Sequence, residues 1–120
     1  KLYFSRLASN KDENPVVFQI KEYLHQNYAV PSLSVPDISE HVRLSPTYVC
    51  TLFKNETGQT LNQYLTDYRI KMSKQFLSDP LYKITDISAK VGYSDGNYYS
   101  KAFRKIVGLS PSEYREKMLR

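Results

Sequence analysis

One helical face in the second half of the chain carries four hydrogen-bonding side chains: Asn97, Ser100, Lys101 and Arg104. Their intervals of three and four residues are those of neighbours on one side of an α-helix. Asn97 can form a bidentate pair with an adenine edge, and Lys101 can donate to the O6 and N7 acceptors of guanine. Arg104 lies one turn further on and suits a phosphate group. This row of residues therefore has the chemistry needed to read a groove of double-stranded DNA.

A second row with the same spacing lies fifty residues earlier in the chain. It consists of Thr47, Cys50, Thr51 and Lys54. Threonine can hydrogen-bond a base edge or pack its methyl group against thymine. Cys50 offers only a small apolar surface or a weak donor. Because its groups are shorter, we expect weaker base readout from this row than from the later one.

An internal repeat positions the two rows. Asp37-Ile38-Ser39 matches Asp86-Ile87-Ser88, and the pairs Phe53/Phe103, Gly58/Gly108 and Tyr64/Tyr114 continue the correspondence. Each copy reads as a short helix, a turn of three to four residues and a longer helix that ends at glycine. This pattern is typical of a helix-turn-helix unit. On the longer helices, an apolar stripe that includes the two phenylalanines turns inward, so the polar rows face outward. We expect Ile106 to lie on the inward stripe and the two phenylalanines to anchor the cores.

The periodicity is helical throughout, and no hairpin signal joins two strand-like runs, so we predict an all-α fold of seven helices. The first follows Asn14-Pro15, the second follows Ser34, the third runs from Ser45-Pro46 to Gly58, the fourth from Thr60 to about Leu77, the fifth from Thr85 to Gly92, the sixth from Ser94 or Asp95 to Gly108, and the seventh starts at Ser110-Pro111. The fourth helix has roughly 17 residues and would span about 25 Å. It could hold two DNA-reading helices near the spacing of successive major grooves, about 34 Å.

Charge and composition narrow the function further. Residues 66–120 contain eleven basic and six acidic residues, an excess that equals the net charge of +5 for the whole chain. A basic surface of this kind attracts phosphate backbones. One cysteine and two histidines are too few for the usual zinc sets, and four glycines leave little room for phosphate-cradling loops. We expect no metal, no cofactor, no membrane span and a cytoplasmic location.

The chain resembles the DNA-binding domain of the AraC/XylS family of bacterial transcription regulators over about residues 14–118. The residues that carry the resemblance include Asp37-Ile38, Leu52-Phe53-Lys54, Ile84-Thr85-Asp86-Ile87, Val91-Gly92-Tyr93 and Gly108-Leu109-Ser110-Pro111. It is especially similar to the output domain of two-component response regulators, in which a receiver domain comes first. The resemblance implies residues 1–13 as a linker from an upstream regulatory or receiver domain, residues 14–59 and 80–120 as two helix-turn-helix units, and residues 60–79 as a linker helix. RNA polymerase is a possible further partner.

The resemblance and the two polar rows together define the expected contacts with DNA. Base contacts are expected from Thr47, Cys50 and Thr51 in the first unit, and from Gly96, Asn97, Ser100 and Lys101 in the second. Phosphate contacts are expected from Ser45, Tyr48, Lys54, Arg69, Tyr98, Arg104 and Lys105.

Two other classes of function are weighed against DNA binding. His41 and Cys50 could form the base and thiol nucleophile of an enzyme, but they fall on different predicted helices and no third orienting group is apparent, so we expect no enzymatic activity. The eleven tyrosines could instead serve a helical protein-interaction module. Four of them lie on predicted core stripes, which favours DNA binding: Tyr23, Tyr64, Tyr68 and Tyr114.

Overall fold

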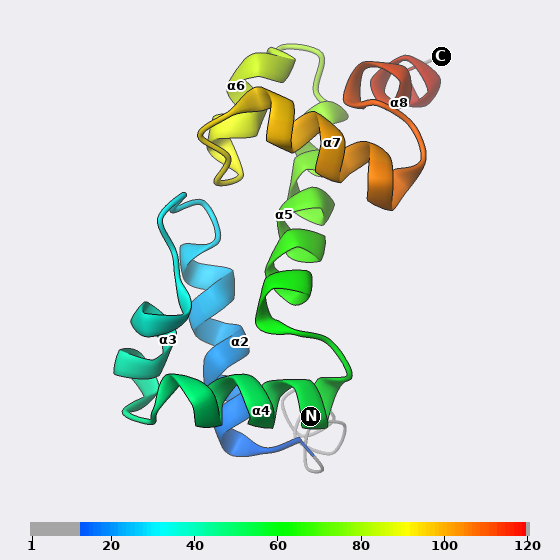
Figure 1. Ribbon diagram of the computed structural model, residues 1–120. Coiled ribbons are helices and arrows are strands. Elements are labelled where there is room, and N and C mark those ends of the chain that lie inside the picture. Colours follow the sequence, from blue (N-terminus) through cyan, green and yellow to red (C-terminus); the bar gives the residue numbers. More distant parts are fainter. Residues whose placement is uncertain (1–12, 120) are drawn as a thin grey trace, which may run out of the picture.

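The computed structural model describes residues 13–119 (Figure 1). Over this range the chain is all-α, as predicted, with the seven helices α2 (Pro15–Asn27), α3 (Val35–Val42), α4 (Pro46–Thr57), α5 (Leu61–Leu77), α6 (Ile84–Lys90), α7 (Gly96–Val107) and α8 (Pro111–Met118). The proposed linker at residues 1–13 lies, apart from Glu13, outside the described residues. Within residues 13–119 no helix combines the length and the apolar composition that crossing a bilayer would require.

Side-chain caps explain where most of the helices begin. The side-chain oxygen of Asn14 accepts a hydrogen bond from the N–H of Val16 at 2.7 Å, ahead of the proline that opens α2. Thr60 and Ser110 form capping boxes with Gln63 and Glu113, at the predicted starts of α5 and α8. Each box satisfies two backbone donors that a helix would otherwise leave free.

Glycine ends the longer helix of each repeat, α4 and α7, as predicted. Gly58 after α4 and Gly108 after α7 take the left-handed conformation, with φ of 82° and 92°. The prediction that Thr85 caps the fifth helix is wrong. Helix α6 begins at Ile84, because the backbone carbonyl of Lys83 accepts hydrogen bonds from the N–H groups of Asp86 and Ile87. Thr85 therefore lies inside the first turn.

Two separate hydrophobic cores lie along α5, the linker helix between the two units. The first comprises Val17, Ile20, Leu24, Ile38, Val49, Phe53, Leu61 and Leu65, and the second comprises Ile70, Leu77, Ile87, Val91, Tyr99 and Phe103. Helix α5 contributes its first half to one core and its second half to the other. Phe53 and Phe103 are fully buried, which confirms their role as core anchors.

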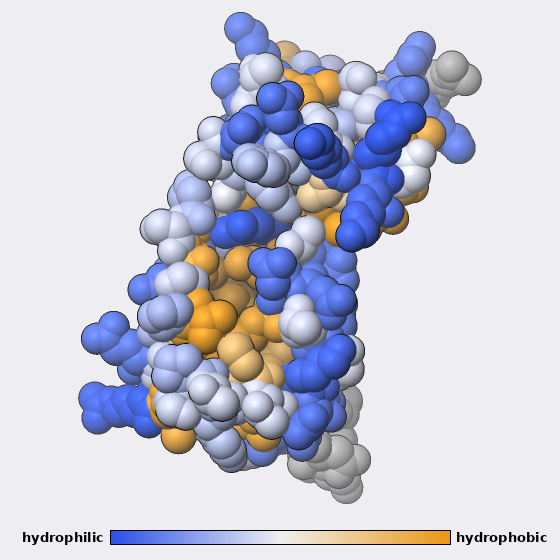
Figure 2. Space-filling view, in the orientation of Figure 1, coloured by the Kyte–Doolittle hydropathy of each residue, from blue (hydrophilic) through white to orange (hydrophobic). Residues whose placement is uncertain are grey.

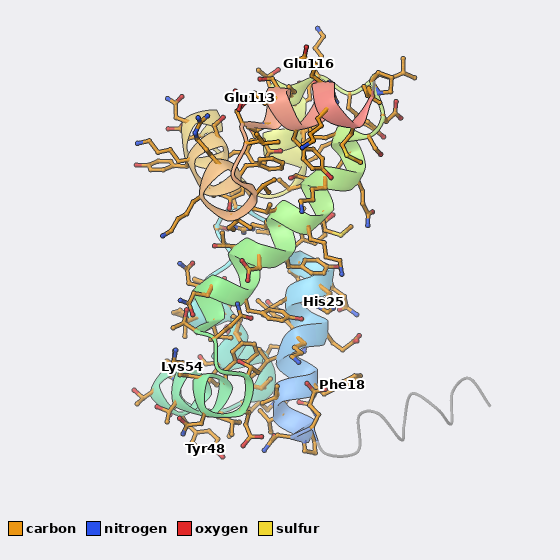
Figure 3. The ribbon with its side chains drawn as sticks, turned by 90° about the vertical axis from the view of Figure 1, so that its right-hand side faces the viewer. Phe18, His25, Tyr48, Lys54, Glu113 and Glu116 are labelled. Carbon is orange, nitrogen blue, oxygen red and sulfur yellow. The ribbon has the colours of Figure 1, made fainter. Side chains whose placement is uncertain are left out.

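The linker helix places α4 and α7 at its two ends. In Figure 1 both helices run from left to right; α7 crosses in front of the upper part of α5, and α4 lies below the lower end of α5, in front of α2. In the view turned by 90°, both lie toward the left of the molecule, the side that the labelled Lys54 marks (Figure 3). Phe18 and His25, on α2, lie on the opposite side of α5 in that view. The two helices thus share one face of the molecule.

Candidate nucleic-acid interface

The outward row of α4 is fixed by the two residues that anchor its other side. Val49 and Phe53 are fully buried in the first core. With this side turned inward, the opposite side of the helix carries the predicted row, and all of its members are exposed: Thr47, Cys50, Thr51 and Lys54. Helix α4 can therefore present two hydroxyls, a thiol and an ammonium group to a ligand in front of it.

The outward row of α7 is built in the same way. Tyr99 and Phe103 are buried in the second core, and the exposed side of the helix carries Asn97, Ser100, Lys101, Arg104 and Lys105. An amide, a hydroxyl and three cations lie along this face. It has the donors needed both for base edges and for phosphates.

Both rows start at a capped helix N-terminus. The Ser45 hydroxyl accepts a hydrogen bond from the N–H of Tyr48 at 3.1 Å, and the Asp95 carboxylate accepts one from the N–H of Asn97 at 2.8 Å. The Ser45 hydroxyl is uncharged, so the positive end of the α4 dipole can still favour an anion such as phosphate. At the start of α7 the negative charge of the Asp95 carboxylate already offsets the positive end of the dipole. Sequence reasoning did not give Asp95 an electrostatic role, although its acidic type at an N-cap was a sufficient signal.

The cations of the two rows are held only loosely. Arg104 lies 3.7 Å from the carboxylate of Glu113, and both side chains are exposed, so the pair contributes little. The backbone N–H of Ser110 donates to Glu113 and holds the pKa of that carboxyl below its ordinary value, with smaller contributions from the Ser110 hydroxyl and from Arg104. Lys54 donates to the carbonyl oxygen of Gly58 at 3.3 Å. These contacts leave both side chains able to turn toward a phosphate.

The surface of this face is polar at both ends. Figure 2 shows hydrophilic side chains over α4 and α7, with a hydrophobic area between them over α2 and the loop that follows it. All predicted DNA contacts are exposed with one exception, Arg69. The expected contact residues of α4 and α7 therefore lie at two separate polar ends of a single face.

Arg69 does not belong to this surface, and the prediction that it contacts a phosphate is wrong. It is only 9% exposed. Its guanidinium donates to the backbone carbonyls of Tyr28 and Val30. Burial lowers the pKa of this group from its ordinary value, opposed by the neighbouring Tyr93. The basic type of Arg69 suggested a surface role, but its donors are used inside the molecule.

Ile106 also departs from the prediction, because it is 43% exposed rather than buried. It lines a groove of about 570 Å³ between α5 and α7, together with Asn62, Thr66, Asp67 and Lys105. The first unit has Glu56 at the matching place. The apolar type of Ile106 suggested a core position, but the groove between the units leaves it accessible.

His41 and Cys50, the two residues considered for an enzyme, lie on α3 and α4. The ring of His41 stacks on that of Tyr23, with 4.3 Å between ring centres, and Cys50 is exposed on the outward row of α4. Among residues 13–119, no three His, Cys, Asp or Glu side chains come close enough to hold a metal ion. The geometry favours the polar rows of α4 and α7 over these residues as the functional site.

The fold and this face define a protein with two helix-turn-helix units. The sequence profile of a family described as "Helix-turn-helix domain" matches residues 38–117. The chain therefore belongs to this family, in its AraC/XylS group of DNA-binding transcription regulators.

Individual relatives agree with this assignment. The chain is 36% identical to the "Msm operon regulatory protein" of Streptococcus mutans, over 92% of this chain and 39% of the relative. It is 35% identical to the "Transcriptional regulatory protein HptR" of Staphylococcus aureus, over 92% of this chain and 43% of the relative. The structure is similar to the C-terminal domain of AraT, a response regulator from Geobacillus stearothermophilus, with a TM-score of 0.85, 28% identity and 88% of each chain covered. The chain thus spans about two fifths of the length of these curated relatives.

Proposed function

We propose that this chain is the output domain of a bacterial transcription regulator and binds one bipartite site on double-stranded DNA. Helices α4 and α7 enter successive major grooves, and one chain reads both half-sites. The observation that carries this proposal is the matched pair of exposed polar rows on one face, at the two ends of α5. Helix α5 has 17 residues, a length of about 25 Å, against a groove repeat of about 34 Å. A bend in the DNA would accommodate the remaining difference.

The residue roles follow from the chemistry of the rows. Base contacts come from Thr47, Cys50 and Thr51 on α4 and from Gly96, Asn97, Ser100 and Lys101 on α7. Phosphate contacts come from Ser45, Tyr48, Lys54, Tyr98, Arg104 and Lys105, all of them exposed. The units lie at residues 14–59 and 80–120, with the linker helix at residues 60–79.

The wider context belongs to the same proposal. An upstream regulatory domain precedes residue 14 in the full protein, and the likeness to the C-terminal domain of a response regulator supports a receiver domain in that place. The protein works in the cytoplasm, without enzymatic activity, and RNA polymerase is a second partner.

Selection of bound sites from random DNA, followed by footprinting, tests this function. We expect two protected half-sites about one helical turn apart. Raising the salt concentration from 50 to 200 mM should weaken binding about a thousandfold if some six phosphates are contacted. Binding to a protein partner through an apolar interface would barely respond to salt. Enrichment of a single short site, or of none, would contradict the proposal.

A further inference from the structure

The guanidinium of Arg69 connects the linker helix α5, by two hydrogen bonds, to the chain at the end of α2. Its Nε donates to the carbonyl oxygen of Tyr28 at 2.8 Å, and its Nη2 donates to that of Val30 at 2.9 Å. Both carbonyls follow Asn27, the last residue of α2, where the negative end of the helix dipole favours a cation. Because the guanidinium is planar and its donors are fixed relative to one another, the two hydrogen bonds define the angle between α5 and α2.

Residues of the second unit pack against this same point. A Cβ atom at Gly92 would collide with the carbonyl oxygen of Tyr28 and would lie 2.7 Å from Nε of Arg69. Gly92 also has φ of +98°, a conformation that favours glycine. The guanidinium of Arg69 lies 5.5 Å from the centre of the Tyr93 ring. The loop after α6 therefore closes over the contact between α5 and α2.

Tyr28 extends the contact into both cores. Its side chain packs against the hydrophobic residues of the first core and against those of the second. Its ring also meets the ring of Tyr68 edge-on, with 5.2 Å between centres. Residues of the first unit, the linker helix and the second unit thus meet at one place, which we call the joint: Tyr28, Val30, Arg69, Gly92 and Tyr93.

Arg115 makes the same kind of contact elsewhere in the chain. Its Nε donates to the carbonyl oxygen of Leu77 at 3.0 Å, and its Nη2 donates to that of Asp79 at 3.1 Å. This pair of hydrogen bonds joins α8 to the end of α5, so it lies within the second half of the chain. Arg115 therefore provides a matched control with the same side chain and the same type of acceptor.

We propose that Arg69 is a positioning residue that sets the distance and twist between α4 and α7, and so selects the number of base pairs between the two half-sites. The proposal rests on the proposed function. Two linked binding units gain affinity from each other only when their separation matches that of their sites. A rigid joint narrows the range of spacings that both units can occupy together. A loosened joint lowers the affinity for DNA with the preferred spacing. It also reduces the difference in affinity between that spacing and the others.

A series of DNA duplexes tests the proposal. The selected bipartite site is lengthened or shortened by one to three base pairs between its half-sites, and each duplex is titrated with the wild-type chain, Arg69→Met, Arg69→Lys and Arg115→Met. We expect Arg69→Met to bind the preferred spacing about tenfold more weakly and to show a flatter dependence on spacing. Arg69→Lys should recover part of the preference, because an ammonium group can still donate to one carbonyl. Arg115→Met should keep the wild-type profile, and no variant should change affinity for a duplex that holds the second half-site alone.

A distance measurement without DNA separates this proposal from the proposed function. Cys50 lies on the outward row of α4, and Ser100→Cys places a second thiol at the matching position of α7. Spin labels on the two thiols report the distribution of distances between α4 and α7. We expect one narrow distribution in the Ser100→Cys parent and in its Arg115→Met derivative. The distribution should be broader in Arg69→Met and shifted in Gly92→Ala, which inserts a methyl group into the joint.

Each outcome decides between the alternatives. An unchanged distance distribution in both Arg69→Met and Gly92→Ala would overturn the positioning role, and so would an equal broadening in Arg115→Met. If Arg69→Met fails to fold, Arg69→Lys and Gly92→Ala carry the same test. A wild-type chain that binds no bipartite DNA would end the proposed function, while the distance measurement would still report whether the joint is rigid.

Discussion

Helix α7 of the second unit carries three cations on its exposed side, Lys101, Arg104 and Lys105, whereas α4 of the first unit carries one at the matching places, Lys54. The other two places on α4 hold a threonine and an asparagine. Electrostatic attraction to phosphates grows with the number of cations presented. The second unit should therefore supply most of the affinity, and the first should mainly add length to the recognised site.

The cores of the two units differ as well. Val49 in the first unit corresponds to Tyr99 in the second, and both are buried. The Tyr99 hydroxyl forms no hydrogen bond within the part of the chain that the structure describes, although Ser73 is its neighbour. Burial raises the pKa of this hydroxyl, opposed by the neighbouring Ser73. The repeat thus preserves the backbone geometry of a unit while its core volume and its charge vary.

The largest effect is expected from making the second core resemble the first. Tyr99→Val leaves a cavity in a closely packed core and should lower the free energy of unfolding by about 3 kcal/mol. Tyr99→Phe keeps the ring and removes only the buried hydroxyl, so it should change stability by less than about 1 kcal/mol. Urea unfolding of the three proteins measures both effects. A larger loss in Tyr99→Phe would indicate a hydrogen bond to Ser73 and would contradict the view that the hydroxyl has no partner.

The next largest effect is expected on DNA affinity, when the two polar rows are each changed at one matching place. Lys101→Ala should weaken DNA binding by about 1–3 kcal/mol and relax the preference at one base pair. Thr51→Ala, fifty residues earlier on α4, removes only a hydroxyl and a methyl group and should have a smaller effect. Titration against duplexes with each base pair at the contacted position measures both changes. Equal weakening by Lys101→Ala on every sequence would make Lys101 a phosphate contact instead.

A smaller effect should appear in the dependence on salt. Arg104→Ala should weaken binding on all sequences and lower the slope of log affinity against log salt by about one. Lys54→Ala should do the same in the first unit, because it lies at the matching place. Glu113→Gln is the control, since glutamine can still accept the N–H of Ser110 but no longer attracts Arg104 as a charge. A slope that Arg104→Ala leaves unchanged would remove Arg104 from the interface.

The sequence predicted most of this architecture because local signals agreed with one another. Matched residues and two glycine stops defined the repeat, and the apolar spacing identified which residues of α4 and α7 are exposed. Arg69, Ile106 and Gly92 could not be assigned in this way. Their surroundings are formed by segments distant in the chain, so the surface role expected of Arg69 and the buried role expected of Ile106 followed residue type alone. Gly92 was interpreted as a helix stop, yet it also lets the second unit approach Tyr28.

The smallest effect is expected in how the free energy of unfolding depends on pH. It arises in the first unit, which contains both histidines of the chain. The His25 ring stacks on Tyr68 with 4.3 Å between centres, and its Nε2 lies 2.8 Å from the Tyr64 hydroxyl. Burial lowers the pKa of His25 below its ordinary value of 6.5, with Lys21 and Lys71 acting in the same direction and Glu22 opposing them.

The sign of the pH effect follows from this lowered pKa. Below pH 6.5 the unfolded chain binds a proton at His25 while the folded chain keeps the ring neutral, so the free energy of unfolding should fall with falling pH until the folded pKa is passed. Urea unfolding at a series of pH values, for the wild-type chain and His25→Gln, isolates the contribution, because all other groups are shared. The variant should show a shallower decline below pH 6.5. Identical pH profiles would mean that the ring titrates alike in the folded and unfolded chain, and that its stack on Tyr68 does not exclude the proton.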